Sequence, residues 1–232
     1  MSQRVVITGA TGGIGQALSH KLAEKGFELL LTGRSHKKLS ELAESLPQDQ
    51  VALTQSADLT NPEQVHQFFE KAAPFDAVVH LAGQGLIKPL ADTTDAEFLR
   101  VSNINVRGTF LVAQHACRIM AEAKRGRFLT VPGILGKAVM KNASVYIATK
   151  FAVTGFIKAL AQEYQRQGIH FGLYHLGGVD TPFWDDLGMG VQRDKMISAE
   201  TAAEALCWGL EMPAHLALNE VTFQPESHQL PI

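Results

Sequence analysis

Short apolar runs alternate along the chain with segments in which apolar residues recur every three or four positions. The short runs are apolar almost throughout, which is typical of parallel strands that are covered on both faces. The intervening segments have the period of amphipathic helices. This alternation predicts a series of βαβ units, with strands at 4–8, 27–32, 51–55, 77–81, 128–131 and 169–174.

Signals for helix ends support this division. Leu18 and Leu22 lie on the buried face of a helix that Gly26 is placed to end. Asn61 followed by Pro62 is typical of a capping residue and a first helical position. Further helices are expected over 39–46, from about 94, through 110–119, over 145–167 and over 202–210, with a short strand over 220–223.

The order of these elements predicts an α/β fold. We expect a single doubly wound Rossmann-type domain over residues 1–232, with a parallel sheet of about seven strands and helices on both faces. In such folds the ligand binds beyond the carboxyl ends of the strands.

Composition narrows the classes of partner. The chain has 21 basic and 23 acidic residues and a net charge of -2, so nothing favours nucleic acid or an anionic membrane. Nine histidines lack metal-ligand spacing, so no metal site is expected. Cys117 and Cys207 fall in helical stretches, where buried reduced thiols are expected. Without a signal peptide or an apolar run near 18 residues, the sequence predicts a soluble cytoplasmic protein that binds small molecules or copies of itself.

A glycine-rich turn follows the first strand and opens the first helix. Its spacing is G-x-x-x-G-x-G, and an ordinary structural turn is the alternative interpretation. Glycines there allow a tight turn, close approach to a pyrophosphate and close packing of the helix on the strand. The turn therefore predicts a bound nicotinamide dinucleotide, contacted by Gly9, Ala10, Thr11, Gly12, Gly13, Ile14 and Gly15.

The end of the second strand favours NADP over NAD. An NAD site usually has an acidic residue about twenty positions beyond the turn, whereas NADP needs a cation for its extra phosphate. Here Gly33 is followed by Arg34, whose guanidinium can bind a phosphate through two hydrogen bonds. The alternative is that Arg34 is a solvated residue at a helix start.

Tyr146 and Lys150 stand four positions apart at the start of the longest expected helix, so they share a face. A phenol with a pKa of about 10 exchanges protons poorly near neutrality unless a nearby cation favours the phenolate. Lys150 is placed to do this. By itself the pair is also a common arrangement on a helix surface.

With these features in place, the sequence resembles the short-chain dehydrogenase/reductase family along nearly its whole length. The resemblance rests on Thr8 to Gly15, Asp58-Leu59, Ala82-Gly83, Asn105 to Gly108, Tyr146 to Lys150, and Val179 to Thr181.

The resemblance implies a role for each matching residue. Tyr146 would be the general acid or base, Lys150 would hold the nicotinamide ribose, and Asn105 would support a proton-relay water. Cofactor contacts would come from Asp58, Leu59, His80, Ala82, Gly83, Val179 and Thr181. Read alone, Asp58 could be a loop or capping residue and Asn105 a buried helix amide. Helices around 110–120 and 151–164 would pair in a homodimer or homotetramer.

Three positions depart from the family pattern. Gly133 stands where the family has a catalytic serine, and loss of such a donor costs about 10²- to 10³-fold in rate. Thr130, Ser144 or a water molecule could replace the hydroxyl, although Ser144 could equally cap the long helix. His80 replaces an asparagine that contributes mainly its backbone, and Leu176 replaces a proline.

We therefore expect an NADP-dependent oxidoreductase that moves hydride between the nicotinamide and a carbonyl or secondary alcohol. The alternative is a dinucleotide-binding protein with weak or no turnover. A substrate loop is expected at about 182–200, where Phe183, Trp184 and Leu187 precede the glycine-rich residues 188–190. This loop is interpreted either as an apolar lid or as an ordinary surface loop. His175 is expected nearer the substrate than the other histidines.

Overall fold

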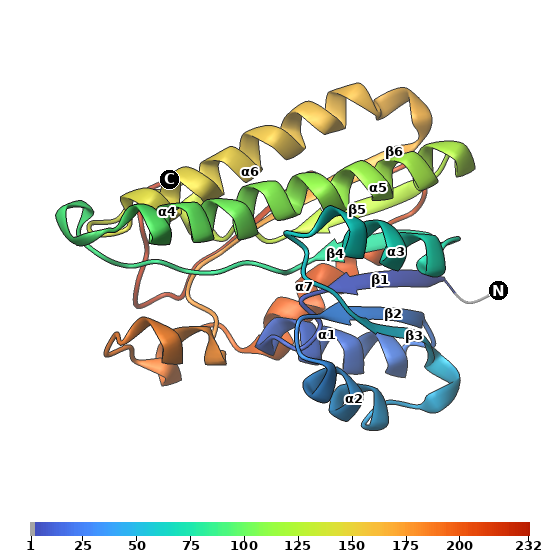
Figure 1. The fold of residues 1–232 in the computed structure, drawn as a ribbon, viewed down its shortest axis with the longest axis horizontal. Helices are drawn as coiled ribbons and strands as arrows, with labels where there is room; N and C mark the ends of the chain where they lie inside the picture. The colour runs from blue at the N-terminus through green and yellow to red at the C-terminus, as the bar shows by residue number, and fades with distance from the viewer. Residues whose placement is uncertain (1–2) are drawn as a thin grey trace.

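Seven parallel strands form one twisted sheet in the computed structural model, which describes residues 3–232 (Figure 1). Their spatial order is β3-β2-β1-β4-β5-β6-β7, so the chain reverses its direction of winding between β1 and β4. This order confirms the predicted doubly wound fold and opens a crevice at the carboxyl ends of β1 and β4. The strands are β1 (Arg4–Thr8), β2 (Glu28–Gly33), β3 (Val51–Ser56), β4 (Ala77–His80), β5 (Gly126–Thr130), β6 (Ile169–Leu176) and β7 (Glu220–Phe223).

Helices cover both faces of the sheet (Figure 1). One face carries α1 (Gly13–Glu24), α2 (His36–Glu44) and α7 (Ala199–Glu211), and the other α3 (Pro62–Ala72), α4 (Asp95–Ser102), α5 (Gly108–Ala123) and α6 (Ser144–Glu163).

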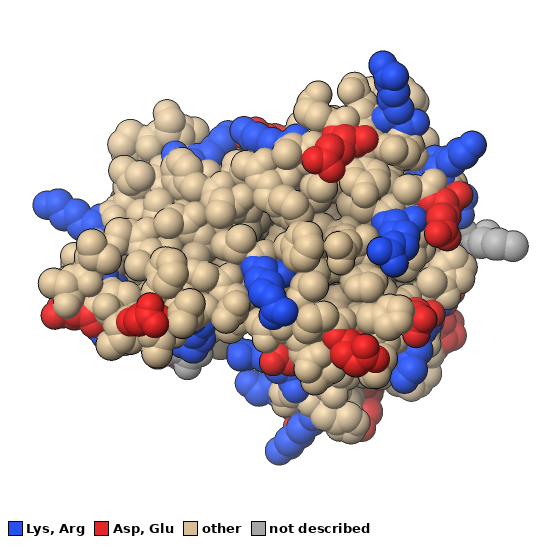
Figure 2. All heavy atoms as spheres, turned by 45° about the horizontal axis from the view of Figure 1, so that its top comes forward, with Lys and Arg blue, Asp and Glu red and all other residues tan. Residues whose placement is uncertain are grey.

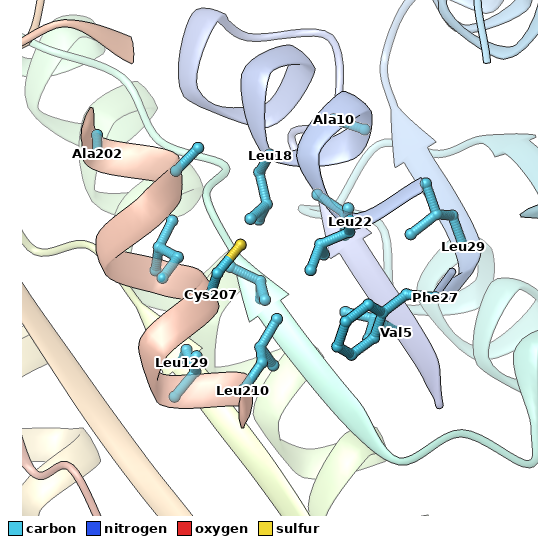
Figure 3. Close-up of a cluster of buried hydrophobic side chains, with 14 of the residues drawn as sticks. Val5, Ala10, Leu18, Leu22, Phe27, Leu29, Leu129, Ala202, Cys207 and Leu210 are labelled. Carbon is cyan, nitrogen blue, oxygen red and sulfur yellow. The ribbon is translucent and has the colours of Figure 1, made fainter. Parts of the chain in front are cut away.

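Alternate strand residues serve the two faces, because side chains along a strand point to opposite sides. Val5 and Ile7 pack under α1 and α7, whereas Val6 packs under α3 and α5. Figure 3 shows the first of these clusters, in which Cys207 of α7 lies near Leu18 of α1. Both clusters are buried, which accounts for the apolar character of the strands.

Several helix starts carry side-chain caps, of which the cap at Asn61 was predicted. The Asn61 side chain accepts hydrogen bonds from the amides of Glu63 and Gln64, at 3.0 and 3.2 Å. Thr94 and Glu97 form a reciprocal capping box at the start of α4. These caps satisfy amides that have no partner within the helix, so the sequence signals and the observed starts agree.

The α4 and α5 helices are joined by one π-helical turn, Asn103–Arg107, and run as one continuous rod (Figure 1). The sequence predicts two separate helices here. Hydrophobic periodicity does not reveal a turn that is wider by one residue, and such turns often occur at functional sites.

The α6 helix also differs from expectation. It ends at Glu163 and is followed by a 3₁₀ turn over Gln165–Gln167, and its N-cap is Ala143, with no side-chain cap. Its length and composition alone would allow it to cross a membrane, although the sequence analysis expects no segment of this kind. Here Val153 and Ile157 of α6 belong to the core under the sheet. One face of α6 therefore packs on the core.

The charged side chains and the two cysteines differ in where they lie. Lys, Arg, Asp and Glu are interspersed on the face seen in Figure 2, without a large area of one sign. Cys117 and Cys207 are buried free thiols, and burial raises the pKa of both.

Candidate active site

A cleft of about 1570 Å³ opens at the carboxyl ends of the strands. It runs from the glycine turn and the end of β2 to the start of α6 and the segment after β7. Most residues predicted to bind the cofactor or act in catalysis line it, namely Gly9, Thr11, Gly12, Gly13, Ile14, Gly15, Arg34, Asp58, Leu59, Ala82, Gly83, Tyr146, Lys150, Val179 and Thr181. Three predicted residues, Ala10, His80 and Asn105, do not line it.

The glycine turn has the geometry of an anion cradle. Gly9 adopts a positive φ of 68°, and a Cβ atom there would lie 2.8 Å from the amide nitrogen of Ala82. A Cβ atom at Gly15 would lie 2.4 Å from the carbonyl oxygen of Gly9. The N-cap of α1 is Gly12, which has no side chain. The first amides of α1 therefore have no hydrogen bond to a capping side chain. These amides and the helix dipole fit a pyrophosphate.

Ala10 does not line the cleft. Its side chain is fully buried in the core, and its amide donates to the carbonyl oxygen of Thr32 at 3.1 Å. The Ala10 side chain faces the core, whereas the next residue, Thr11, lines the cleft. Ala10 therefore anchors the turn to β2.

The far end of the cleft carries two cations. Arg34 directly follows β2 and is exposed, and Lys38 lies one turn into α2. Both line the cleft, and the Ser35 side chain caps α2 between them by accepting from the Lys38 amide at 3.3 Å. Sequence reasoning missed Lys38, which lies just before the helix expected over 39–46.

Asp58 is held within its own loop. Its Oδ1 atom accepts from the amide and the hydroxyl of Thr60, at 2.9 and 2.8 Å. This is the local turn role that the sequence left open for an aspartate at this position. Asp58 lines the cleft at the same time, beside Leu59.

Tyr146 and Lys150 lie together at the other end of the cleft. The Lys150 Nζ atom is 5.4 Å from the centre of the Tyr146 ring, and it donates to the carbonyl oxygen of Val131 at 3.5 Å. Burial lowers the pKa of Lys150 to about 8. Burial also raises the pKa of the Tyr146 phenol well above its usual value, opposite to the lowering expected from Lys150. Loss of solvation outweighs the neighbouring charge, so the phenol keeps its proton near neutrality.

Asn105 fastens the loop after β4 to α6. Its Oδ1 accepts from the amide of Gln84 at 2.8 Å, and its Nδ2 donates to the Gln84 carbonyl oxygen and to Thr149 Oγ1, each at 2.9 Å. The π-helical turn directs this buried side chain, which is 1% exposed, beneath the cleft. Its contacts are those of the buried amide that the sequence analysis gave as an alternative.

The His80 side chain points away from the cleft, beneath it. Its Nδ1 is 2.7 Å from Thr8 Oγ1, and its Nε2 is 3.0 Å from Thr109 Oγ1. Because the Thr109 hydroxyl donates to the Asn105 carbonyl oxygen at 2.6 Å, it accepts from Nε2–H, and Nδ1 accepts from Thr8. Burial lowers the pKa of His80 to about 3, so the ring is neutral. The side chain ties β1 and β4 to the π-helical turn under the cleft.

Gly133 has a backbone conformation that suits glycine alone. Its φ is 75° and its ψ is 175°. Its carbonyl oxygen accepts from the Gly136 amide at 3.0 Å and from His175 Nδ1 at 3.2 Å. His175 is fully buried under this loop, so it holds the loop instead of facing a substrate, and burial lowers its pKa.

Neither side chain considered as a replacement for the missing serine lines the cleft. The Thr130 hydroxyl donates to the His80 carbonyl oxygen at 2.9 Å and is buried. Ser144 is exposed at the start of α6 and does not cap it. A polar group that sequence reasoning missed does line the cleft: the buried Oε1 of Gln84 has no hydrogen-bond partner within residues 3–232.

Part of the predicted substrate loop covers Tyr146. The loop contains 3₁₀ turns at Pro182–Leu187 and Arg193–Lys195. The Phe183 ring lies 6.3 Å from the Tyr146 ring, and the Trp184 indole N–H donates to the Val179 carbonyl oxygen at 2.8 Å. Phe183, Trp184 and Leu187 all line the cleft, which agrees with the lid interpretation over the surface-loop one.

Comparison with known proteins places the chain in a family. Residues 3–191 match the family model described as short chain dehydrogenase. An uncharacterized oxidoreductase of Staphylococcus aureus (strain USA300) is 32% identical over 224 residues, covering 95% of this chain and 96% of that protein. An uncharacterized oxidoreductase of Staphylococcus epidermidis is 30% identical over 224 residues, again covering 95% of this chain and 96% of that protein.

Solved structures agree in fold. An alcohol dehydrogenase from the archaeon Thermococcus sibiricus, complexed with 5-hydroxy-NADP, superimposes with a TM-score of 0.91 at 24% identity, and each chain is fully covered. Levodione reductase gives a TM-score of 0.86 at 26% identity, with 97% of each chain covered. The family match, the curated relatives and the arrangement of the cleft agree, and the chain belongs to the short-chain dehydrogenase/reductase family of oxidoreductases.

Proposed function

We propose that this protein is an NADP-dependent oxidoreductase that interconverts a carbonyl and a secondary alcohol, with Tyr146 as general acid or base. The observation that carries the proposal is that Tyr146 and Lys150 lie next to each other in the same cleft as the glycine turn, with Lys150 buried and Tyr146 half-buried. A protonated phenol and a nearby ammonium are the groups that a carbonyl reduction requires.

The residues of the chain account for the proton transfer. When bound, a reduced nicotinamide supplies the hydride that adds to the carbonyl carbon. Tyr146 donates its phenolic proton to the carbonyl oxygen, whose C=O π electrons form the new O–H bond, and the resulting phenolate regains a proton from solvent. Lys150, with a pKa of about 8, is mostly charged at neutral pH and stabilises that phenolate. In the reverse direction the phenolate accepts the alcohol proton.

The cofactor preference is proposed from Arg34 and Lys38. Two cations at the far end of the cleft suit the extra phosphate of NADP. Arg34→Ala is expected to raise the Kd for NADPH at least tenfold and to leave that for NADH within about twofold, measured by fluorescence titration. Lys71→Ala, a basic residue of α3 that does not line the cleft, is the control. Equal losses for both cofactors would contradict the preference.

Turnover tests the proposed chemistry. NADPH consumption is followed across a panel of aldehydes and ketones with the wild type, Tyr146→Phe and Tyr164→Phe. Tyr146→Phe is expected to abolish turnover while the Kd for NADPH stays unchanged. Tyr164→Phe, which removes a hydroxyl at the far end of the same helix, is expected to keep turnover. Full activity of Tyr146→Phe would refute the proposed role.

A second candidate is a dinucleotide-binding protein with weak or no turnover. Gly133 lacks a hydroxyl, and Thr130 and Ser144 do not line the cleft, which favours this alternative. It predicts that NADPH raises the melting temperature while no carbonyl in the panel is consumed. Measurable, Tyr146-dependent turnover excludes it.

Self-association is proposed from the outer surface of α5 and α6. Phe110 and Phe151 are each 43% exposed on these helices, a position that would be covered if the two helices paired with those of a second copy. Gel filtration with light scattering is expected to give a dimer or tetramer. Phe110→Lys combined with Phe151→Lys is expected to give monomers, and an unchanged mass would rule out this surface.

A further inference from the structure

The segment after β7 closes the substrate end of the cleft. We call residues 224–230 the C-terminal strap. The strap begins beside the end of β6, where the Gly177 amide donates to the Phe223 carbonyl oxygen at 2.7 Å and a Cβ atom on Gly177 would lie 2.6 Å from Pro225. The strap ends at Leu230, which packs in one apolar cluster with Tyr146 and Met140. It therefore spans from the end of β6 to the proposed catalytic tyrosine.

A single side chain fastens the strap. Gln224 Nε2 donates to the Leu230 carbonyl oxygen at 3.0 Å, and Gln224 Oε1 accepts from the Leu230 amide at 2.7 Å. Both polar groups of one amide are thus used on the backbone of one residue. Inside the closed loop the His228 amide donates to the Pro225 carbonyl oxygen at 3.2 Å. These bonds fix where the Leu230 side chain lies.

Apart from Lys150, whose Nζ atom lies 5.4 Å from its ring centre, Tyr146 has apolar neighbours. Its cluster includes Ile87 and Met140 from the adjoining loops, in addition to Leu230 of the strap. The Phe183 ring packs 6.3 Å away. The remaining members of this cluster are Ile134, Leu135, Ala138, Ala143 and Ile147.

Two cations of the cleft and the substrate loop form ion pairs. Lys88 lines the cleft but is paired with Glu97 at 3.0 Å. Arg193 is paired with Asp180 at 3.0 Å in the substrate loop. Arg100 and Lys195 also line the cleft. The wall beside Tyr146 is therefore suited to a hydrocarbon group, because burial of apolar surface is the main favourable contribution it can make.

We infer that the C-terminal strap forms the wall of an apolar substrate pocket, with Leu230 as a specificity-determining residue and Gln224 as its positioning residue. The substrate class is an uncharged carbonyl compound or alcohol that bears a medium-length alkyl or similar apolar group. This inference rests on the proposed function for its kinetic test, but ligand binding tests it independently.

The kinetic test uses a series of unbranched methyl ketones from acetone to 2-nonanone. For the wild type, kcat/KM is expected to rise about fourfold for each added methylene until the pocket is filled. Leu230→Ala and Gln224→Ala are each expected to lower kcat/KM for 2-nonanone about tenfold, through KM, and to leave acetone within twofold. Leu230→Met is expected to keep the preference. Glu226→Ala, an exposed strap residue that does not line the cleft, is the matched control.

The binding test does not need turnover. The chain has two tryptophans, so Trp208→Phe leaves Trp184, which lines the cleft, as the only emitter. With NADP present, 2-nonanol is expected to change this emission at lower concentration than 2-propanol, and Leu230→Ala is expected to remove the difference. Melting temperatures of all variants check that the fold is retained.

The outcomes separate the two proposals. Chain-length-dependent binding without turnover of any carbonyl refutes the proposed function and supports the pocket. Turnover that ignores chain length, or is unchanged in Leu230→Ala and Gln224→Ala, overturns the pocket and leaves the function standing. A keto acid preferred over the ketone of equal length would also overturn it.

Discussion

Restoring the missing serine is expected to destabilise the protein. In Gly133→Ser the new Cβ atom has room, since its nearest described neighbour is the Leu176 carbonyl oxygen at 3.5 Å. The cost comes instead from the backbone, which has a φ of 75° and a ψ of 175°. An L-residue held in this region costs about 1–3 kcal/mol. For a chain of this size each kcal/mol lowers Tm by about 2–4 °C.

The Gly133 loop resists relaxation, because its carbonyl oxygen is held by the Gly136 amide and by His175. Urea unfolding followed by circular dichroism measures the loss, and Gly133→Ala is the matched control, because it carries the same strain without a hydroxyl. We expect the two variants to lose equal stability. If the serine variant is as stable as the wild type and turns over faster than the alanine variant, the backbone has relaxed and the reasoning fails.

Three further predictions concern buried and capping groups. Lys150→Met is expected to stabilise the cofactor-free protein by about 3 kcal/mol at pH 7, because burial lowers the pKa of Lys150 from 10.5 to about 8. The gain should shrink between pH 8 and 10.5, where the folded wild type loses this proton first; an equal gain at pH 7 and 10.5 would exclude this origin. His80, whose pKa falls from 6.5 to about 3, binds a proton more readily when unfolded. Its contribution to stability is therefore lost as the pH falls from 6.5, and His80→Asn should lose about 2–3 kcal/mol less than the wild type between pH 7 and 4.5 in urea titrations; parallel losses would contradict this. Asn61→Ala, which removes the α3 cap, should lower the free energy of unfolding by about 1 kcal/mol in the same titrations, and Asn61→Ser should recover most of it.

The fold could be predicted from local signals in the sequence. Strand and helix periods, the Asn61 and Thr94 caps and the glycine turn depend on neighbours a few residues away, so each could be interpreted before the chain was folded. The same holds for Tyr146 and Lys150, which share a helix face because they are four positions apart. Even the absence of a hydroxyl at Gly133 was visible, because it follows from residue identity alone.

Which side chains reach the cleft was decided by the tertiary structure. Ala10 and His80 sit in the predicted motifs, yet both face the interior, because a side chain at a strand end or turn takes the direction that packing allows. Leu230 and Tyr146, more than eighty residues apart in sequence, pack against the same buried cluster, and no periodic pattern marks the strap that brings Leu230 there. Sequence alone therefore determined the sheet, the glycine turn and the placement of Tyr146 beside Lys150. Which apolar side chains surround Tyr146 was decided only by the tertiary structure, because they come together through long-range contacts that local spacing in the sequence does not show.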